Sequence, residues 1–148
     1  MQPHFDSVSA AFLAEHTIAT LSTVSSDGVV HGAVIYYVIL GEQNIYFISK
    51  TGTSKIANIT EHPQVAFTVF DAAKAQTLQI SAKARVETDE NTRHFVFDNI
   101  VKPHLYSGEM LMPPVTALKE GDYVVIHVQP EGIHFSDYKK EILDQRNA

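Results

Sequence analysis

The densest group of side chains able to bind a phosphate lies between Ser49 and Lys55. Two lysines, Lys50 and Lys55, flank a segment rich in hydroxyl groups. The pattern predicts a strand that ends near Lys50, a Thr-Gly-Thr turn, and a helix opened by Ser54, and the backbone N–H groups at a helix start favour anions. The stretch is therefore a candidate site for one phosphate group. A capped helix with solvated lysines explains the same spacing, and spacing alone favours that simpler interpretation.

Eight histidines raise the question of a metal site. None of them has HxH, HExxH or HxxxH spacing, and the chain has no cysteine, which excludes thiolate ligands, disulfides and cysteine nucleophiles. His94 and Asp98 would share one helix face, and His127 and His134 could face each other across a final hairpin. Because two ligands do not make a metal site, we expect none.

Motifs for nucleotides and for nucleophilic catalysis are missing as well. The sequence contains no GxGxxG, GxxxxGK[ST] or GxSxG segment. A formal net charge of −6 disfavours nucleic-acid binding, because it repels phosphate backbones. No apolar run approaches the roughly 20 residues that span a bilayer, and the N-terminus lacks the pattern of a signal peptide. We therefore expect a cytoplasmic protein that binds neither nucleic acid nor membranes.

The elements that must position these residues follow from apolar periodicity. A length of 148 residues with 45% apolar residues predicts a single domain over 1–148. Helical spacing predicts short helices over 7–15, 53–61 and 89–100. β-Branched and alternating runs predict strands over 18–24, 29–40, 45–49, 65–70, 78–86, 123–128 and 133–138, with turns at 25–28 and 129–132. Residues 101–121 are expected to form an irregular connection, and residues 139–148 a polar, flexible tail.

The fold class predicted from these elements is mainly β (α+β). About seven strands joined mostly by hairpins make an antiparallel sheet, with a few short helices beside it. Such a sheet closes most easily into a barrel, because closure removes its exposed edges.

The order of the elements resembles a known family. The segments YFIS, T-x-x-SK and N-x-x-x-HP-x-VAF, followed by the alternating strand LQISAKARV, resemble the flavin-binding split barrels of the pyridoxamine 5′-phosphate oxidase-like superfamily. The similarity covers residues 5–86 and extends more weakly to residue 138. It implies a Greek-key split β-barrel, a homodimer, and FMN held between the two subunits.

The resemblance also implies which residues contact FMN. Ser54 and Lys55 match the family's phosphate-binding pair, in which the first residue is often arginine. Lys50 and Thr51 match the strand end beside the ribityl phosphate. The remaining matches are Phe47, Ile48 and Ser49, whose backbone would lie along the flavin ring, Gln79 near the ribityl chain or ring edge, and Val34 and Ile35 on the dimethylbenzene side.

One departure from the family bears on the reaction. True pyridoxamine 5′-phosphate oxidases have a longer C-terminal region with Trp and Arg residues that bind the substrate phosphate, whereas this chain has no tryptophan and only Arg146 in its tail. We therefore expect an FMN-dependent oxidoreductase that does not oxidise vitamin B6. The alternatives are a non-enzymatic flavin or haem binder, a stress-response protein, a deazaflavin-dependent reductase, and an interaction module without ligand. Lys83 and Arg85 are candidate contacts for NADH or NADPH as reductant.

Overall fold

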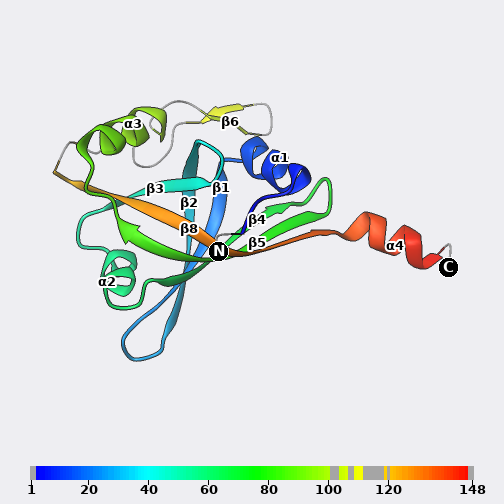
Figure 1. Ribbon diagram of the computed structural model, residues 1–148, viewed down its shortest axis with the longest axis horizontal. Helices are drawn as coiled ribbons and strands as arrows, with labels where there is room; N and C mark the ends of the chain where they lie inside the picture. The colour runs from blue at the N-terminus through cyan, green and yellow to red at the C-terminus, as the bar shows by residue number, and fades with distance from the viewer. Residues whose placement is uncertain (1–2, 101–103, 107–108, 112–118, 120, 147–148) are drawn as a thin grey trace.

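Six antiparallel strands close into a barrel (Figure 1) in the computed structural model, which describes residues 3–100, 104–106, 109–111, 119 and 121–146. The strands are β1 (Ile18–Val24), β2 (Val30–Leu40), β3 (Asn44–Lys50), β4 (Gln64–Asp71), β5 (Gln76–Val86) and β8 (Tyr123–Asp137). Their order around the barrel is β1-β2-β3-β8-β5-β4. This architecture confirms the mainly β, antiparallel split-barrel fold class predicted from the sequence.

Buried and exposed residues alternate along the strands, so one set of side chains faces the barrel interior and the other faces outward. In β5, Leu78, Ile80, Ala82 and Ala84 are buried, whereas the residues between them are exposed. The interior holds the main apolar cluster, in which Phe67 meets the ring of Tyr37 edge-on at 5.1 Å between centroids. The alternating apolar residues that predict a half-buried strand are therefore the residues that fill the core.

Two helices pack against this core from opposite ends of β1. Helix α1 (Ser7–Glu15) precedes β1 and contributes Phe12 and Leu13, and the hydroxyl of Tyr37 donates to the Leu13 carbonyl at 2.6 Å. Helix α2 (Ser54–Glu61) contributes Ile59, and its Asn58 donates to Thr23 at the other end of β1 at 3.0 Å. Helix α1 begins as predicted, with Asp6 accepting from the Ser9 N–H at 2.7 Å.

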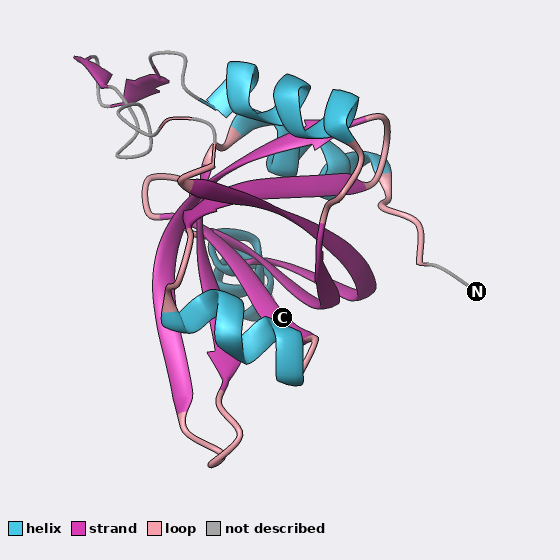
Figure 2. Ribbon diagram, turned by 90° about the vertical axis from the view of Figure 1, so that its left-hand side faces the viewer, coloured by secondary structure: helices cyan, strands magenta, loops and turns pink. Residues whose placement is uncertain are grey.

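A third helix covers the outside of the barrel. Helix α3 (Glu90–Ile100) lies over β3 and β8 (Figures 1 and 2), where Val96 and Ile100 pack with Tyr46, Ile48, Tyr123 and Val125. The short strands β6 (His104–Tyr106) and β7 (Glu109–Leu111) pair antiparallel, within a region predicted to be irregular; the rest of residues 101–118 lies outside the described residues. No helix in the described part of the chain has the length and apolar character of a membrane-spanning segment.

The last strand corrects a prediction. Residues 123–137 form the single strand β8, whereas the sequence predicts two strands around a turn at 129–132. The ladder with β5 shifts register at this place: Ser81 pairs with Gly132 and Ala82 with Pro130, so Glu131 is the extra residue of a bulge. A bulge accommodates proline and glycine without ending the strand. His127 and His134 therefore lie along one strand and do not face each other across a hairpin.

The C-terminal segment is helical. Helix α4 (Tyr138–Arg146) projects from the end of β8 (Figure 1), and none of its residues is buried. Asp137 caps it by accepting from the Lys140 N–H at 3.0 Å. The predicted tail thus has helical secondary structure, and its predicted flexibility stays a prediction.

Candidate functional site

The turn between β3 and α2 is fixed by one backbone conformation and two hydrogen bonds. Gly52 has a φ of +81°, a conformation that glycine adopts without strain. The Thr51 N–H donates to the Asp122 carbonyl at 3.0 Å, which anchors the turn to the residue before β8. The hydroxyls of Ser49 and Thr53 are 2.9 Å apart and hydrogen-bonded, so they join the strand end to the helix start. These contacts bring predicted site residues from both elements together.

The start of α2 has free donors. Thr53 occupies the N-cap position, but its side chain makes no capping bond because it bonds to Ser49 instead. Within the described residues, the N–H groups of Ser54 and Lys55 find no acceptor, and Lys50 and Lys55 form no ion pair. Lys50 and Ser54 are exposed and Lys55 is half-buried. The arrangement has the donors and the positive charge that a phosphate needs.

The strand before this turn has one open backbone edge. β3 pairs with β8 as far as Lys50, but its pairing with β2 stops at Phe47 opposite Tyr37. The backbone of residues 48–50 therefore has a strand on one side only. The side chain of Phe47 is fully buried in the barrel core, and that of Ile48 lies beneath α3. A ligand beside this edge would contact backbone groups of these residues and not their side chains.

Gln79 lies on a different surface, the outer face of β2, β1, β4 and β5. The register aligns Val34, Thr20, Thr68 and Gln79 as neighbours across the four strands. The neighbouring row of outward-facing residues, two positions along each strand, consists of the small residues Gly32, Ser22, Ala66 and Ser81. Ile35, by contrast, is buried in the core. Among the described residues, no hydrogen bond or ion pair links Gln79 to residues 49–55.

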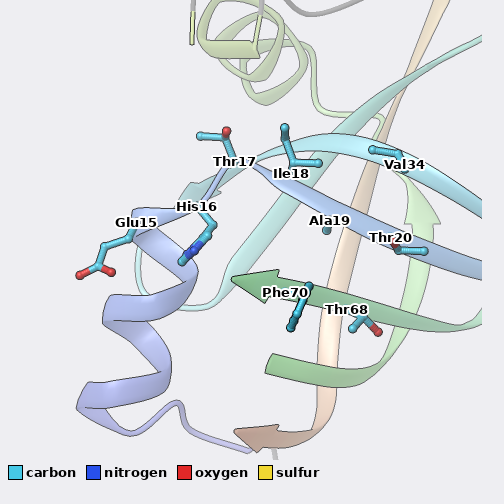
Figure 3. Close-up of a pocket in the computed structure, with 9 residues that line it drawn as sticks. All are labelled: Glu15, His16, Thr17, Ile18, Ala19, Thr20, Val34, Thr68 and Phe70. Atoms are coloured by element: carbon cyan, nitrogen blue, oxygen red, sulfur yellow. The ribbon is translucent and has the colours of Figure 1, made fainter. Parts of the chain in front are cut away.

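A slot lies at the edge of this outer face, beside the C-terminal end of α1 (Figure 3). We call it the α1 slot; its volume is about 280 Å³. It is lined by Glu15, His16, Thr17, Ile18, Ala19, Thr20, Val34, Thr68 and Phe70. Sequence reasoning missed this slot, because its walls come from α1, β1, β2 and β4, and no local motif marks them.

His16 and Asp71 form a hydrogen-bonded pair beside the slot. His16 Nε2 is 2.9 Å from Asp71 Oδ2, and His16 Nδ1 is 2.6 Å from the Phe12 carbonyl oxygen. The pKa of Asp71 is lowered, first by the Lys74 N–H that donates to the carboxylate and then by His16. Both imidazole nitrogens thus lie within hydrogen-bond distance of an oxygen atom, one from β4 and one from α1.

The two cations proposed to meet a reductant have partners in the structure. Lys83 lies 3.9 Å from Glu131, and Arg85 lies 2.9 Å from the largely buried Glu87. Both lysine and arginine side chains remain more than half exposed, and both lie on the outer face of β5 with Gln79, as predicted. Among the described residues, no group of three or more potential ligands gathers as a metal site would require.

A comparison with protein families identifies the chain. The family model described as pyridoxamine 5′-phosphate oxidase matches residues 5–137 of the 148. The chain belongs to this family. Among curated proteins, no match of significance is found.

Three solved structures share its fold. A conserved hypothetical protein of Mycobacterium tuberculosis, Rv2991, is 17% identical, with a TM-score of 0.70 over 95% of this chain and 91% of that one. General stress protein 26 of Bacillus anthracis is 19% identical, with a TM-score of 0.64 over 85% and 89% of the two chains. An F420 reductase is 23% identical, with a TM-score of 0.58 over 80% and 89%. At these identities the similarity establishes the split-barrel fold alone.

Proposed function

We propose that this protein is a cytoplasmic, homodimeric FMN-binding oxidoreductase. The observation that carries the proposal is the start of α2, where the free N–H groups of Ser54 and Lys55 lie beside two unpaired lysines. Membership of the pyridoxamine 5′-phosphate oxidase family supports a flavin as the phosphate-bearing group. FMN supplies two-electron redox chemistry when it is bound.

Different residues fit the phosphate and the ring of a flavin. Lys50, Lys55 and the hydroxyls of Thr51 and Ser54 would hold the phosphate through charge-assisted contacts. The open backbone edge at residues 48–50 would orient the ring, since its unpaired N–H and C=O groups need partners. Val34, 71% exposed on β2, offers an apolar surface for the dimethylbenzene side.

The outer face of the barrel supports a homodimer. The row of small residues on β2, β1, β4 and β5 has no charged side chain, so the backbone of a second subunit could approach it closely. Val30, Val34 and Phe70 beside it are large apolar residues more than 60% exposed. Large exposed apolar side chains grouped on one face are typical of interaction sites. Gln79 lies on the same face, so a second subunit packed here would bring it to a shared flavin cleft.

The reductant proposed is NADH or NADPH, and the oxidised substrate is not a vitamin B6 phosphate. A substrate with its own phosphate needs a second cationic pocket near the ring. The nearest cations on the outer face, Lys83 and Arg85, already bind carboxylates. Their half-exposed side chains still allow contact with a dinucleotide, which carries its phosphates at a distance from its nicotinamide.

Identification of the ligand in purified protein tests the proposal. We expect a yellow protein from which mass spectrometry recovers FMN, and sedimentation as a dimer of the 16.4-kDa chain. Under anaerobic conditions NADH or NADPH should bleach the flavin, and no pyridoxal phosphate should form. A Soret band, a deazaflavin, or a stable monomer that retains FMN would contradict the proposal. FMN that neither nucleotide reduces would indicate a non-enzymatic flavin binder.

A further inference from the structure

His134 lies beside Gln79 on the outer face of the barrel. The ladder between β5 and β8 pairs the two residues directly, and both side chains are exposed. Directly opposed side chains of an antiparallel pair point to the same face, with Cβ atoms about 5 Å apart. His134 therefore extends the outward row described above, which runs from Val34 on β2 to Gln79 on β5. A second subunit that brings Gln79 to a shared flavin cleft brings His134 to the same cleft.

The imidazole ring of His134 is held by a neighbouring hydroxyl. Its Nε2 atom is 3.1 Å from Oγ of Ser136, a buried residue two positions further along β8 and so on the same face. Within the described residues, Nδ1 of His134 has no hydrogen-bond partner. A protonated ring would donate its Nε2–H to the Ser136 hydroxyl oxygen and would keep its Nδ1–H for a ligand.

The surroundings of His134 are polar and uncharged. Its same-face neighbours are Thr77, Gln79 and Ser81 on β5, and Gly132 and Ser136 on β8. His134 takes part in no ion pair among the described residues. Imidazole exchanges a proton near neutral pH, whereas hydroxyl and amide side chains do not. In the row from Val34 to His134, the histidine is thus the side chain that is able to deliver a proton.

The cations assigned above have other roles. Lys50 and Lys55 are assigned to the phosphate. Lys83 and Arg85 already bind carboxylates. The proposed reaction still needs a proton source, because a hydride acceptor takes up a proton together with the hydride. The free Nδ1 of His134 meets that need.

We propose that His134 is a catalytic residue that donates a proton to the acceptor reduced by the flavin, a role that rests on the proposed function. A C=C bond conjugated to a carbonyl accepts the hydride at one carbon, and its electron pair moves to the adjacent carbon. That carbon forms a C–H bond with the Nδ1 proton of His134, and the exposed ring regains a proton from water. NADH or NADPH supplies the hydride by way of the flavin.

NMR on the protein freed of its ligand tests the location of His134 without turnover. FMN is titrated in, and the imidazole resonances, assigned with the His134→Asn variant, are followed. We expect FMN to shift the His134 resonances and to leave those of His94 unchanged, because α3 packs on Tyr123 and Val125 in the other half of β8. FMN that binds without a shift at His134 would overturn the proposal. Absence of FMN binding would instead refute the proposed function, on which the role of His134 rests.

Anaerobic reoxidation of the reduced flavin tests the proton transfer. The bound FMN is reduced with dithionite and then mixed with N-ethylmaleimide, which takes a hydride and a proton, or with ferricyanide, which takes electrons alone. The chain has no cysteine, so the maleimide finds no thiol to alkylate. His134→Asn should slow the reaction with the maleimide about 100-fold and leave the ferricyanide reaction unchanged. Equal maleimide rates in wild type and His134→Asn would overturn the proposal.

Further variants separate the donor from its support. Ser136→Ala keeps the imidazole and removes the hydroxyl that orients it, so the maleimide reaction should slow by about 3- to 10-fold. His94→Asn makes the same substitution at an exposed histidine on α3 and should change neither rate. Tyr36 lies two residues from Val34 on the same face of β2 and also bears a proton. A rate loss in Tyr36→Phe with none in His134→Asn would assign the proton to Tyr36 and refute the role of His134.

Discussion

His16 and Asp71 connect the end of α1 to the end of β4 through a 2.9 Å contact between Nε2 and Oδ2. The two residues are 55 positions apart in the sequence, and both side chains are about four-fifths buried. The contact joins α1 to β4 beside the α1 slot, which His16 helps to line. Because the pKa of Asp71 is lowered in the folded protein, titration of its carboxyl group should be measurable as a change in stability.

Asp71→Asn should destabilise the protein in a pH-dependent way. The folded-state pKa of Asp71 lies below 3.8, so its carboxylate contributes stability that is fully present above that value and is lost as the pH falls through the folded pKa. Urea denaturation between pH 7 and pH 2 should show a gap between wild type and variant that is constant above about pH 5 and closes in acid. A gap that persists unchanged at pH 2 would contradict the ionic contribution.

His127 should make the protein less stable in mild acid. Burial, and then the charge of Arg85, lower its pKa below 6.5. The folded state therefore binds fewer protons than the unfolded state, so stability falls as the pH drops below 6.5. His127→Phe keeps a ring stacked on Tyr46 but cannot titrate. Its free energy of unfolding should decline less than that of wild type between pH 7 and pH 5; parallel declines would refute the role of His127.

Tyr37→Phe should cost about 1–3 kcal/mol of stability. The variant removes the hydroxyl that donates to the Leu13 carbonyl at 2.6 Å and leaves that buried carbonyl without its partner. Tyr138→Phe is the matched control, because Tyr138 is 41% exposed at the start of α4. Chemical denaturation of both variants measures the difference; similar losses in the two would mean that the Tyr37 contact contributes little.

Lys55→Ala should lower FMN affinity by about 10- to 150-fold. A charge-assisted contact to a phosphate contributes about 1.5–3 kcal/mol, and its loss converts to that range of dissociation constants. Lys74→Ala is the control. Lys74 lies on the loop after β4 and pairs with Glu15 of α1, so it is not part of the proposed phosphate site. Fluorescence titration of FMN into each variant provides the values. Equal affinities in the two variants would exclude Lys55 as the phosphate ligand.

Local patterns were sufficient to predict most elements. The first three helices and the first five strands end within two residues of their predicted limits, because alternation, caps and the Asp27–Gly28 turn act over a few residues. Helix α4 lies in the segment predicted to be a tail. Pro130 and Gly132 misled the prediction of β8. Proline and glycine are common in turns. Here β8 pairs with β5 both before and after them, so the strand continues and the extra residue forms a bulge. Whether residues 129–132 form a turn or a bulge depends on pairing with a strand more than 40 positions away, and the local sequence contains no information about that pairing.

The candidate site also has residues that local sequence predicts and residues that only strand pairing places. Ser49, Lys50 and Lys55 could be found from sequence because they lie within one strand–turn–helix unit. Phe47 was correctly placed on β3, but its side chain belongs to the core, which only the barrel closure determines. The α1 slot could not be found, since Phe70 and Val34 line one pocket only after β4 and β2 have paired with the two sides of β1.

The position of β8 in the chain has a consequence for folding during synthesis. β8 is the last barrel strand to be made, yet it lies between β3 and β5 and closes the barrel. Until it emerges from the ribosome, β3 and β5 present unpaired edges, which are templates for association with other chains. Closure by distant pairings is also slow. Aggregation of nascent chains, before any loss of equilibrium stability, is therefore the expected first effect of a defect in β8.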